Sequence, residues 1–374
     1  FKPQDLLLSK IYLFEEHHPE LMEGYPKDLK EDYHKQEEMI SKLRVGAIHE
    51  FLGVTDLKEL IGLATSMENP YLFANAFAKV ELALQEEQVI FDLIESEDDK
   101  QKWFFSSWMS SKERFQGREW ALTKIREIIE ANRYKTSKLA YLYLPLNLDL
   151  ELCKHIDALG IAEIEQEYWG QISPVHFPDM ETLKIAIKKF QKLNRPLSIL
   201  HALGRARYIK EELSSEYIVS NLDNLNLGQY NEPPHIRVDH YLIREVFSNL
   251  HNRDDVDEQK MAENEMKFLF IFDKYGSGIL PKYLYKAIAQ TPSLFMDLIK
   301  QIFKPKNEKL LEQENIEYSE EQRKMIFENA YGVISNFNLI PGLQPDGTII
   351  EEELNNWIDQ LRELAVVSGH EGIT

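Results

Sequence analysis

The segment from Lys138 to Gly204 constrains the fold of this chain more than any other part of its sequence. Its apolar residues form short runs of a few helical turns each, and a Pro, Gly or Asn interrupts each run before the next begins. One helix of that length cannot bury its own apolar stripe in water, so consecutive short helices must pack on one another. The pattern therefore predicts stacked helical hairpins.

The clearest of these predicted helices repeats its apolar residues at spacings of three and four positions. That spacing places them on one face of a helix with 3.6 residues per turn: Leu183, Ala186, Ile187, Phe190 and Leu193. Beyond this helix, Asn194 is a candidate left-handed stop, and Pro196 suits the first position of the next helix. Gly204 is expected to end that second helix as its C-cap.

Similar helical patterns cover the rest of the chain, and no convincing pair of alternating strand patterns accompanies them. The predicted fold class is all-α, an α-solenoid of antiparallel helix pairs that wind as a right-handed superhelix. Such a fold resembles HEAT and TPR arrays, although the period here is irregular. Beyond the central segment we expect helices at 4–19, 28–52, 55–67, 70–80, 88–95, 117–131, 208–227, 240–250, 258–275, 281–290, 293–303, 320–336 and 351–367.

The loop from Gly228 to Pro234 is the clearest internal break in this pattern. It predicts an N-terminal helical-repeat region at 1–227 and a C-terminal one at 235–374, either continuous or loosely separated. Because the chain starts at Phe1 rather than at a methionine, we expect it to be a segment of a longer protein.

Charge and cysteine content exclude several functional classes. The net charge of −20 repels a phosphate backbone, so we expect no binding to duplex nucleic acid. Cys153 is the single cysteine, which allows no internal disulfide and favours a reducing, cytoplasmic setting. No apolar run approaches the roughly 20 residues that a membrane-spanning helix needs, so we expect no membrane partner.

A resemblance rests on short motifs that follow Trp120 in a fixed order. These are Tyr168-Trp169 at the end of a predicted helix, Asn194-Arg195-Pro196 between helices, and Ile340-Pro341-Gly342 with Asp346-Gly347 ahead of Trp357. Residues from about 120 to 374 thereby resemble the helical-repeat region of large, mostly uncharacterised bacterial proteins. The resemblance implies a helical-repeat segment of a larger bacterial protein, with a possible role in a defence system, and it brings no catalytic residues.

No motif for a catalytic nucleophile or a nucleotide-binding loop is present, so the sequence favours a chain without catalytic activity and without a cofactor. Cys153 and His155 diverge around a helix and form no dyad. The sharper alternative is a metal-dependent enzyme on a helical bundle. Two E-x-x-H pairs, Glu15 with His18 and Glu31 with His34, flank a turn and could meet in a hairpin.

A basic strip interrupts the acidic balance between residues 184 and 210, where no Asp or Glu occurs. It can be a solvated face that offsets neighbouring acidic helices, or a docking site for an acidic partner. Its members are Lys184, Lys188, Lys189, Lys192, Arg195, Arg205, Arg207 and Lys210. We therefore expect a protein-interaction scaffold or sensor segment that binds another protein, or another domain of the same longer chain.

Overall fold

The computed structural model describes residues 10–19, 32–173, 176–226, 231–237, 239–269, 280–303, 330–332, 334, 340–344 and 346–370. Within those ranges every regular element is a helix, and the β pairing is limited to an isolated antiparallel bridge between Leu343 and Ile349. The predicted all-α class is therefore confirmed. No helix in this described part is long and apolar enough to span a membrane.

The chain divides into two compact units, Phe1–Ile172 and Ser173–Thr374. The helices of the first unit are η1 (Ile11–Phe14), α2 (Tyr33–Leu52), α3 (Leu57–Ser66), α4 (Pro70–Phe77), α5 (Leu84–Phe91), η2 (Asp92–Glu95), α6 (Asp99–Gln116), α7 (Arg118–Ala131), α8 (Thr136–Leu139), η3 (Ala140–Leu142), α9 (Leu150–Leu159) and α10 (Ala162–Gln171). Those of the second unit are α11 (Met180–Lys192), α12 (Pro196–Arg205), η4 (Ala206–Tyr208), α13 (Ser215–Asp223), α14 (His240–His251), α15 (Glu258–Lys267), α16 (Lys282–Gln290), α17 (Pro292–Ile302) and α20 (Glu351–Ser368).

Local sequence signals explain where many of these helices begin and end. A side-chain oxygen at the N-cap accepts a hydrogen bond from a backbone N–H of the first turn, which satisfies a donor that the helix cannot pair. The N-cap residues that do so are Asp32, Asp56, Asp98, Asp149, Asp179, Ser214, Asp239 and Asp257. As predicted, Asn194 takes a left-handed conformation with φ 53° after α11, and Pro196 is the first residue of α12.

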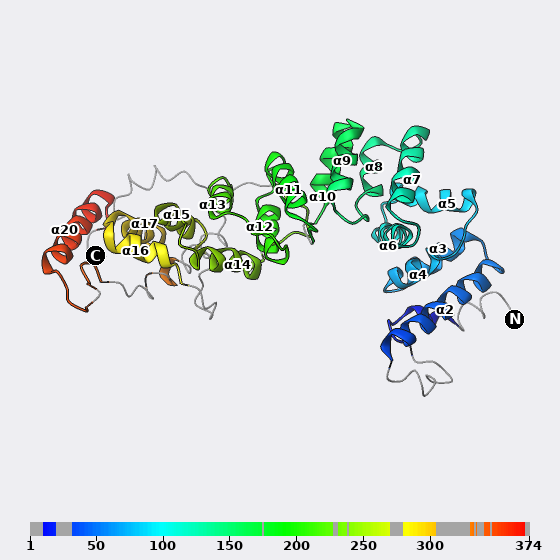
Figure 1. Cartoon of the computed structure of the whole chain (residues 1–374), viewed down its shortest axis with the longest axis horizontal. Helices are drawn as coiled ribbons and strands as arrows, with labels where there is room; N and C mark the ends of the chain where they lie inside the picture. Colours follow the sequence, from blue (N-terminus) through cyan, green and yellow to red (C-terminus); the bar gives the residue numbers. More distant parts are fainter. Residues whose placement is uncertain are drawn as a thin grey trace. The chain divides into compact units, whose positions relative to one another are not determined.

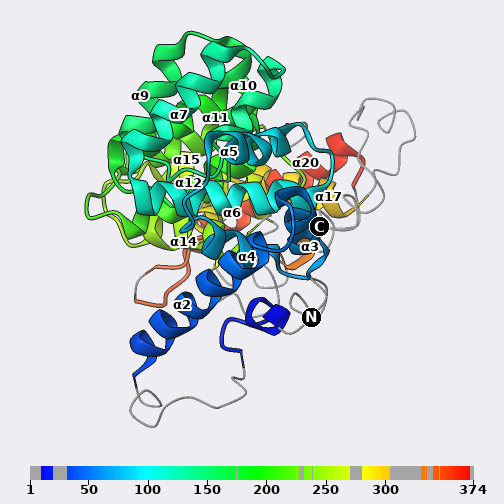
Figure 2. The same ribbon diagram turned by 90° about the vertical axis from the view of Figure 1, so that its right-hand side faces the viewer.

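Aromatic residues form the core of the first unit. Phe73 of α4 lies at its centre, 4.7 Å from Phe14 and 6.4 Å from both Phe51 and Phe104 between ring centroids. These contacts join η1, α2, α4 and α6, and Figure 2 shows α4 lying against α6. Phe104 and Trp108 of α6 are fully buried. Trp103 is instead 42% exposed and stacks on Tyr71 at 5.8 Å.

Alternate helices of the second unit lie side by side, with α11, α13 and α15 following one another and α12 beside α14 (Figure 1). Helices α12 and α14 run in the same direction, since residues later in the first segment contact residues later in the second. His201 lies 2.9 Å from the carbonyl of Arg237, and Arg207 pairs with Glu245 one to two turns further along both segments.

Gly204 lies between these two contacts, inside α12 rather than at its C-cap as the sequence predicted. A Cβ atom added at Gly204 would lie 2.8 Å from both the Cβ and the carbonyl oxygen of Leu242. The glycine therefore allows α12 and α14 to approach closely, and the helix continues past it to Arg205.

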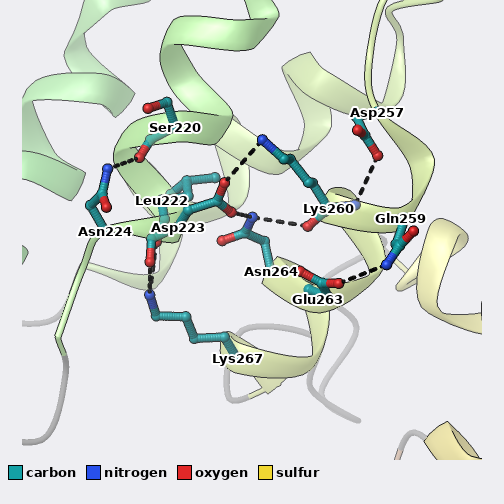
Figure 3. A network of polar contacts seen from close by, with 10 residues as sticks. All are labelled: Ser220, Leu222, Asp223, Asn224, Asp257, Gln259, Lys260, Glu263, Asn264 and Lys267. Atoms are coloured by element: carbon teal, nitrogen blue, oxygen red, sulfur yellow. Dashed lines mark hydrogen bonds and ion pairs between the residues drawn. The ribbon is translucent and has the colours of Figure 1, made fainter.

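The end of α13 is held by polar side chains of α15, as Figure 3 shows. The Lys267 ammonium donates to the carbonyl oxygens of Leu222 and Asp223, at 2.8 and 3.1 Å. The Asp223 carboxylate accepts a hydrogen bond from the buried Asn264 amide at 2.5 Å and lies 3.9 Å from the Lys260 ammonium. A cation placed on the last carbonyls of a helix stabilises groups that have no partner within the helix.

Residues 231–237, which include the described part of the loop predicted as the domain break, belong to the second of the two compact units, Ser173–Thr374. They are attached to the α11–α12 connection. The Asn231 N–H donates to the Asn194 carbonyl at 2.9 Å, and Glu232 contacts Arg195 and Ser198. These long-range contacts, which composition does not reveal, make the loop part of the packed structure.

Candidate docking surface

Buried and exposed residues separate on helix α11, where the predicted basic strip begins. The apolar stripe is buried, as its spacing predicted, at Leu183, Ala186, Ile187 and Phe190. Lys184, Lys188 and Lys192 are exposed, and Lys189 is half-buried. The Lys184 ammonium lies 5.6 Å from the centroid of the Tyr217 ring of α13, a cation–π distance. Lys184, Lys188 and Lys192 thus form an exposed row, called here the α11 lysine row.

Arg195, which the sequence assigns to the same strip, lies inside the second unit. Its side chain is fully buried, and its Nε atom is 3.2 Å from Oε2 of Glu232. Glu232 also accepts hydrogen bonds from the backbone N–H and the hydroxyl of Ser198, at 2.9 and 2.7 Å. Burial lowers the pKa of Arg195, against the opposing effect of the Glu232 carboxylate. Arg195 is therefore enclosed in the packed interior of the second unit and is not part of an exposed basic face.

Two exposed tyrosines enclose Arg207 at the end of α12. The guanidinium carbon of Arg207 lies 4.7 Å from the Tyr208 ring centroid and 5.1 Å from that of Tyr241. The exposed fractions of these two residues are 60% and 51%, so both are accessible from solvent. Arg205 and Arg244 lie 6.0 and 5.9 Å from the Tyr208 and Tyr241 ring centroids, respectively. We call these five residues the aromatic–arginine cluster.

Hydrogen bonds fix Arg207 in this position. One of its terminal nitrogens, Nη2, donates to the hydroxyl oxygens of Tyr208 at 2.6 Å and Tyr241 at 3.1 Å. The other, Nη1, forms an ion pair with the carboxylate of Glu245. The hydrogen bonds to Tyr241 and Tyr208, with a further contribution from Glu245, raise the pKa of Arg207 above its ordinary value. Arg207 therefore stays charged and holds both rings in place.

The structure divides the predicted strip between two places in the second unit. Arg207 contacts Tyr241 and Glu245 of α14, and Arg205 lies over the Tyr208 ring beside it. In the α11 lysine row, Lys184 instead contacts Tyr217 of α13. Lys210 is exposed in the segment that follows η4. Sequence patterns did not reveal Tyr208, Tyr241 and Arg244 as members of the site. Tyr208 directly follows Arg207 and could have been included, but Tyr241 reaches the site through α12–α14 packing, for which the sequence carries no local signal.

The alternative metal site does not assemble among the described residues. Nε2 of His18 lies 3.1 Å from the Tyr33 hydroxyl, and the two rings are 5.0 Å apart. His34 neighbours the same tyrosine ring at 6.2 Å. Glu31 lies outside the described residues, and within them no group of three or more His, Cys, Asp or Glu side chains could hold a metal ion.

Each unit also contains an open cleft. In the second unit a cleft of about 250 Å³ is lined by Gln191, Asn194, Arg195, Pro196, Ile199, Asn224, Leu225 and Asn226. In the first unit a cleft of about 410 Å³ is lined by Leu84, Gln85, Glu87, Gln88, Phe91, Lys124, Glu127, Ile128, Ala131, Arg133 and Tyr134. Lys124 of this lining lies 3.2 Å from Glu127 and 3.8 Å from Glu87, and Arg133 donates a hydrogen bond to Gln88 at 3.1 Å. Neither lining contains a Ser, Thr, Cys or His side chain.

Comparison with known proteins identified no relatives. No protein-family model matches the chain, and neither the curated proteins nor the solved structures contain a match. The function of the chain is therefore inferred from the surface chemistry of its second unit.

Proposed function

We propose that this chain is a non-catalytic scaffold that binds another protein, or another domain of a longer chain, through its second unit. The observation that carries the proposal is the enclosure of Arg207 between two tyrosines that are both more than half exposed. Tyrosine and arginine are enriched at the energetic centres of protein interfaces, where large rings contribute contact area at a small loss of conformational entropy. Rings already held by Arg207 lose little further freedom on binding.

The proposed architecture is an α-solenoid of antiparallel helix pairs. The parallel register of α12 with α14 supports it, because equivalent helices of successive pairs run in the same direction in such arrays. The contacts of Lys184 with Tyr217 and of Gln191 with Asn221 indicate that α11 and α13 also run in the same direction. Arrays of this kind present extended binding surfaces.

Selection of peptides from a random display library tests the proposed function, because such a selection does not require an identified partner. We expect wild-type protein to enrich a defined peptide family, and Tyr208→Ala with Tyr241→Ala to abolish that enrichment because the contact rings are lost. Tyr33→Ala is the matched control, since Tyr33 is 55% exposed in the first unit. Enrichment that is absent for wild type, or that persists in the double variant, would refute binding through this surface.

A further inference from the structure

The hydrogen bonds within the aromatic–arginine cluster determine which groups remain available to a partner. Arg207 donates to the hydroxyl oxygens of Tyr208 and Tyr241, so each oxygen accepts one hydrogen bond inside the cluster. A phenol has one O–H proton, and a guanidinium can only donate. Both tyrosines therefore keep an O–H donor for an acceptor that comes from outside.

Two further cations of the cluster have no acceptor among the described residues. Arg205 and Arg244 contact tyrosine rings, yet neither forms a hydrogen bond or an ion pair with any residue in the part of the chain that the structure describes. The Nε atom of Arg205 is enclosed without a partner. A guanidinium does not lose its charge, and its planar array of N–H groups matches the two oxygens of a carboxylate.

The carboxylate that contacts the cluster, that of Glu245, is already paired with Arg207. It therefore does not neutralise the charges of Arg205 and Arg244. The cluster thus offers donors and positive charge on a protein whose net charge is −20. The acidic remainder of the protein is screened beyond a Debye length of about 8 Å at physiological salt, so the local cations decide what binds here.

Because these contacts complement a negatively charged acceptor, we infer that the aromatic–arginine cluster is a receptor for an acidic peptide segment, whose carboxylates contact Arg205, Arg244 and the two tyrosine hydroxyls. This inference rests on the proposed scaffold function and specifies the chemistry of the partner. Arg207 acts as a positioning residue, because its hydrogen bonds orient both rings while both of its terminal nitrogens already have partners.

Fluorescence anisotropy with the full chain tests the inference. The probe is a short labelled peptide of Glu and Gly, and a Gln and Gly peptide is the neutral comparison. We expect the acidic peptide to bind more tightly than the neutral one. Arg205→Gln with Arg244→Gln should raise its Kd about tenfold or more, because hydrogen bonds to charged groups are strong. Arg362→Gln is the control, since Arg362 on α20 is largely exposed and pairs with Asp359 of its own helix.

A second variant separates the hydroxyl donors from the rings. Tyr208→Phe with Tyr241→Phe keeps both rings and should weaken binding of the acidic peptide several-fold, while circular dichroism confirms an unchanged helix content. Equal affinity for the acidic and neutral peptides would overturn the inference. So would an unchanged Kd in the double arginine variant, or displacement of the peptide by inorganic phosphate but not by free glutamate.

The outcome also distinguishes this inference from the scaffold function. Suppose the acidic peptide binds wild type and the double arginine variant alike, but fails to bind after charge reversal of the α11 lysine row. The receptor assignment is then refuted while a scaffold function remains supported. If the wild-type protein enriches no peptide in the display experiment, the scaffold function itself is refuted.

Discussion

Arg195 and Glu232 form an ion pair inside the second unit, with side-chain exposures of 0% and 3%. Glu232→Ala would remove this carboxylate from the buried guanidinium, and we expect a loss of about 3–5 kcal/mol of stability. Urea unfolding monitored by circular dichroism measures this loss.

The control is Glu38→Ala, which removes an exposed ion pair to Lys42 and should leave stability almost unchanged. If the two variants are equally stable, the carboxylate of Glu232 does not compensate Arg195.

Gly204 sets the distance between α12 and α14. Gly204→Ala would place a Cβ 2.8 Å from backbone and side-chain atoms of Leu242, so we expect a destabilisation of about 1–3 kcal/mol from overpacking. Gly62→Ala in α3 provides the contrast, because no atom lies within 4 Å of the added Cβ and alanine is the better helix former. That variant should gain about 0.5–1 kcal/mol. Thermal or urea unfolding compares both, and a stabilised Gly204→Ala protein would show that the helices can separate at no cost.

Lys267 stabilises the C-terminus of α13 from the neighbouring helix α15. Lys267→Met keeps the apolar stem but removes the ammonium, and we expect a loss of about 1–2 kcal/mol because two carbonyls lose a charged donor. Lys260→Met is matched to it, since Lys260 is half-exposed and lies 3.9 Å from Asp223. It should cost less than about 1 kcal/mol. Equal effects of the two substitutions in urea unfolding would contradict the capping role.

Tyr285 makes the stability of the second unit sensitive to alkaline pH. Burial, with a further contribution from the Glu265 charge, raises the pKa of its hydroxyl from 10.0 to about 12. Between these pH values the hydroxyl loses its proton in the unfolded chain and keeps it in the folded chain. The stability that this group contributes is therefore fully present below pH 10 and is lost as the pH rises toward 12. The expected slope for this group is about 1.4 kcal/mol per pH unit.

Urea unfolding of wild type and Tyr285→Phe across this pH range measures the contribution. Phenylalanine cannot ionise at this position. Above pH about 10 the wild-type protein should therefore lose stability relative to the Tyr285→Phe variant. A difference that stays constant with pH would show that Tyr285 ionises equally in both states.

The α11 lysine row provides a test of whether the exposed lysines bind a partner or balance charge. We expect Lys184→Glu with Lys188→Glu and Lys192→Glu to leave the fold intact, because all three side chains are exposed and the apolar stripe beneath them is untouched. Association with an acidic partner selected in the display experiment should slow, most strongly at low salt. A lower melting temperature with unchanged association would instead assign the row a structural role.

The helices that the sequence predicted best are those with strong periodicity and clear boundary residues. In α11, the spacing of Leu183 and Phe190 predicted the buried face, and Asn194 with Pro196 predicted the break that follows. The segment after Tyr208 was less informative: helix was predicted to residue 227, yet α13 spans only Ser215–Asp223. Polar residues ahead of Ser214 do not reveal where a helix starts until its N-cap is identified.

The candidate site was predictable only in part, because its members come from separate helices. Composition identified the cations Arg205 and Arg207, but it could not separate them from Arg195, whose burial depends on Glu232 from a later loop. Likewise, Tyr241 reaches Arg207 because Gly204 allows α14 to lie close to α12. Contacts of this kind depend on tertiary packing, which a local pattern does not encode.

The contact of residues 231–237 with the α11–α12 connection determines how this polypeptide can be divided. A recombination junction at Pro233-Pro234 would coincide with the most conspicuous break in the sequence, yet it would fall directly beside Glu232. An exchange that removed Glu232 would leave Arg195 charged and enclosed. A segment exchanged intact would therefore have to run from α11 to the end of residues 231–237. The break that is most conspicuous in the sequence is one of the least suitable places to exchange parts.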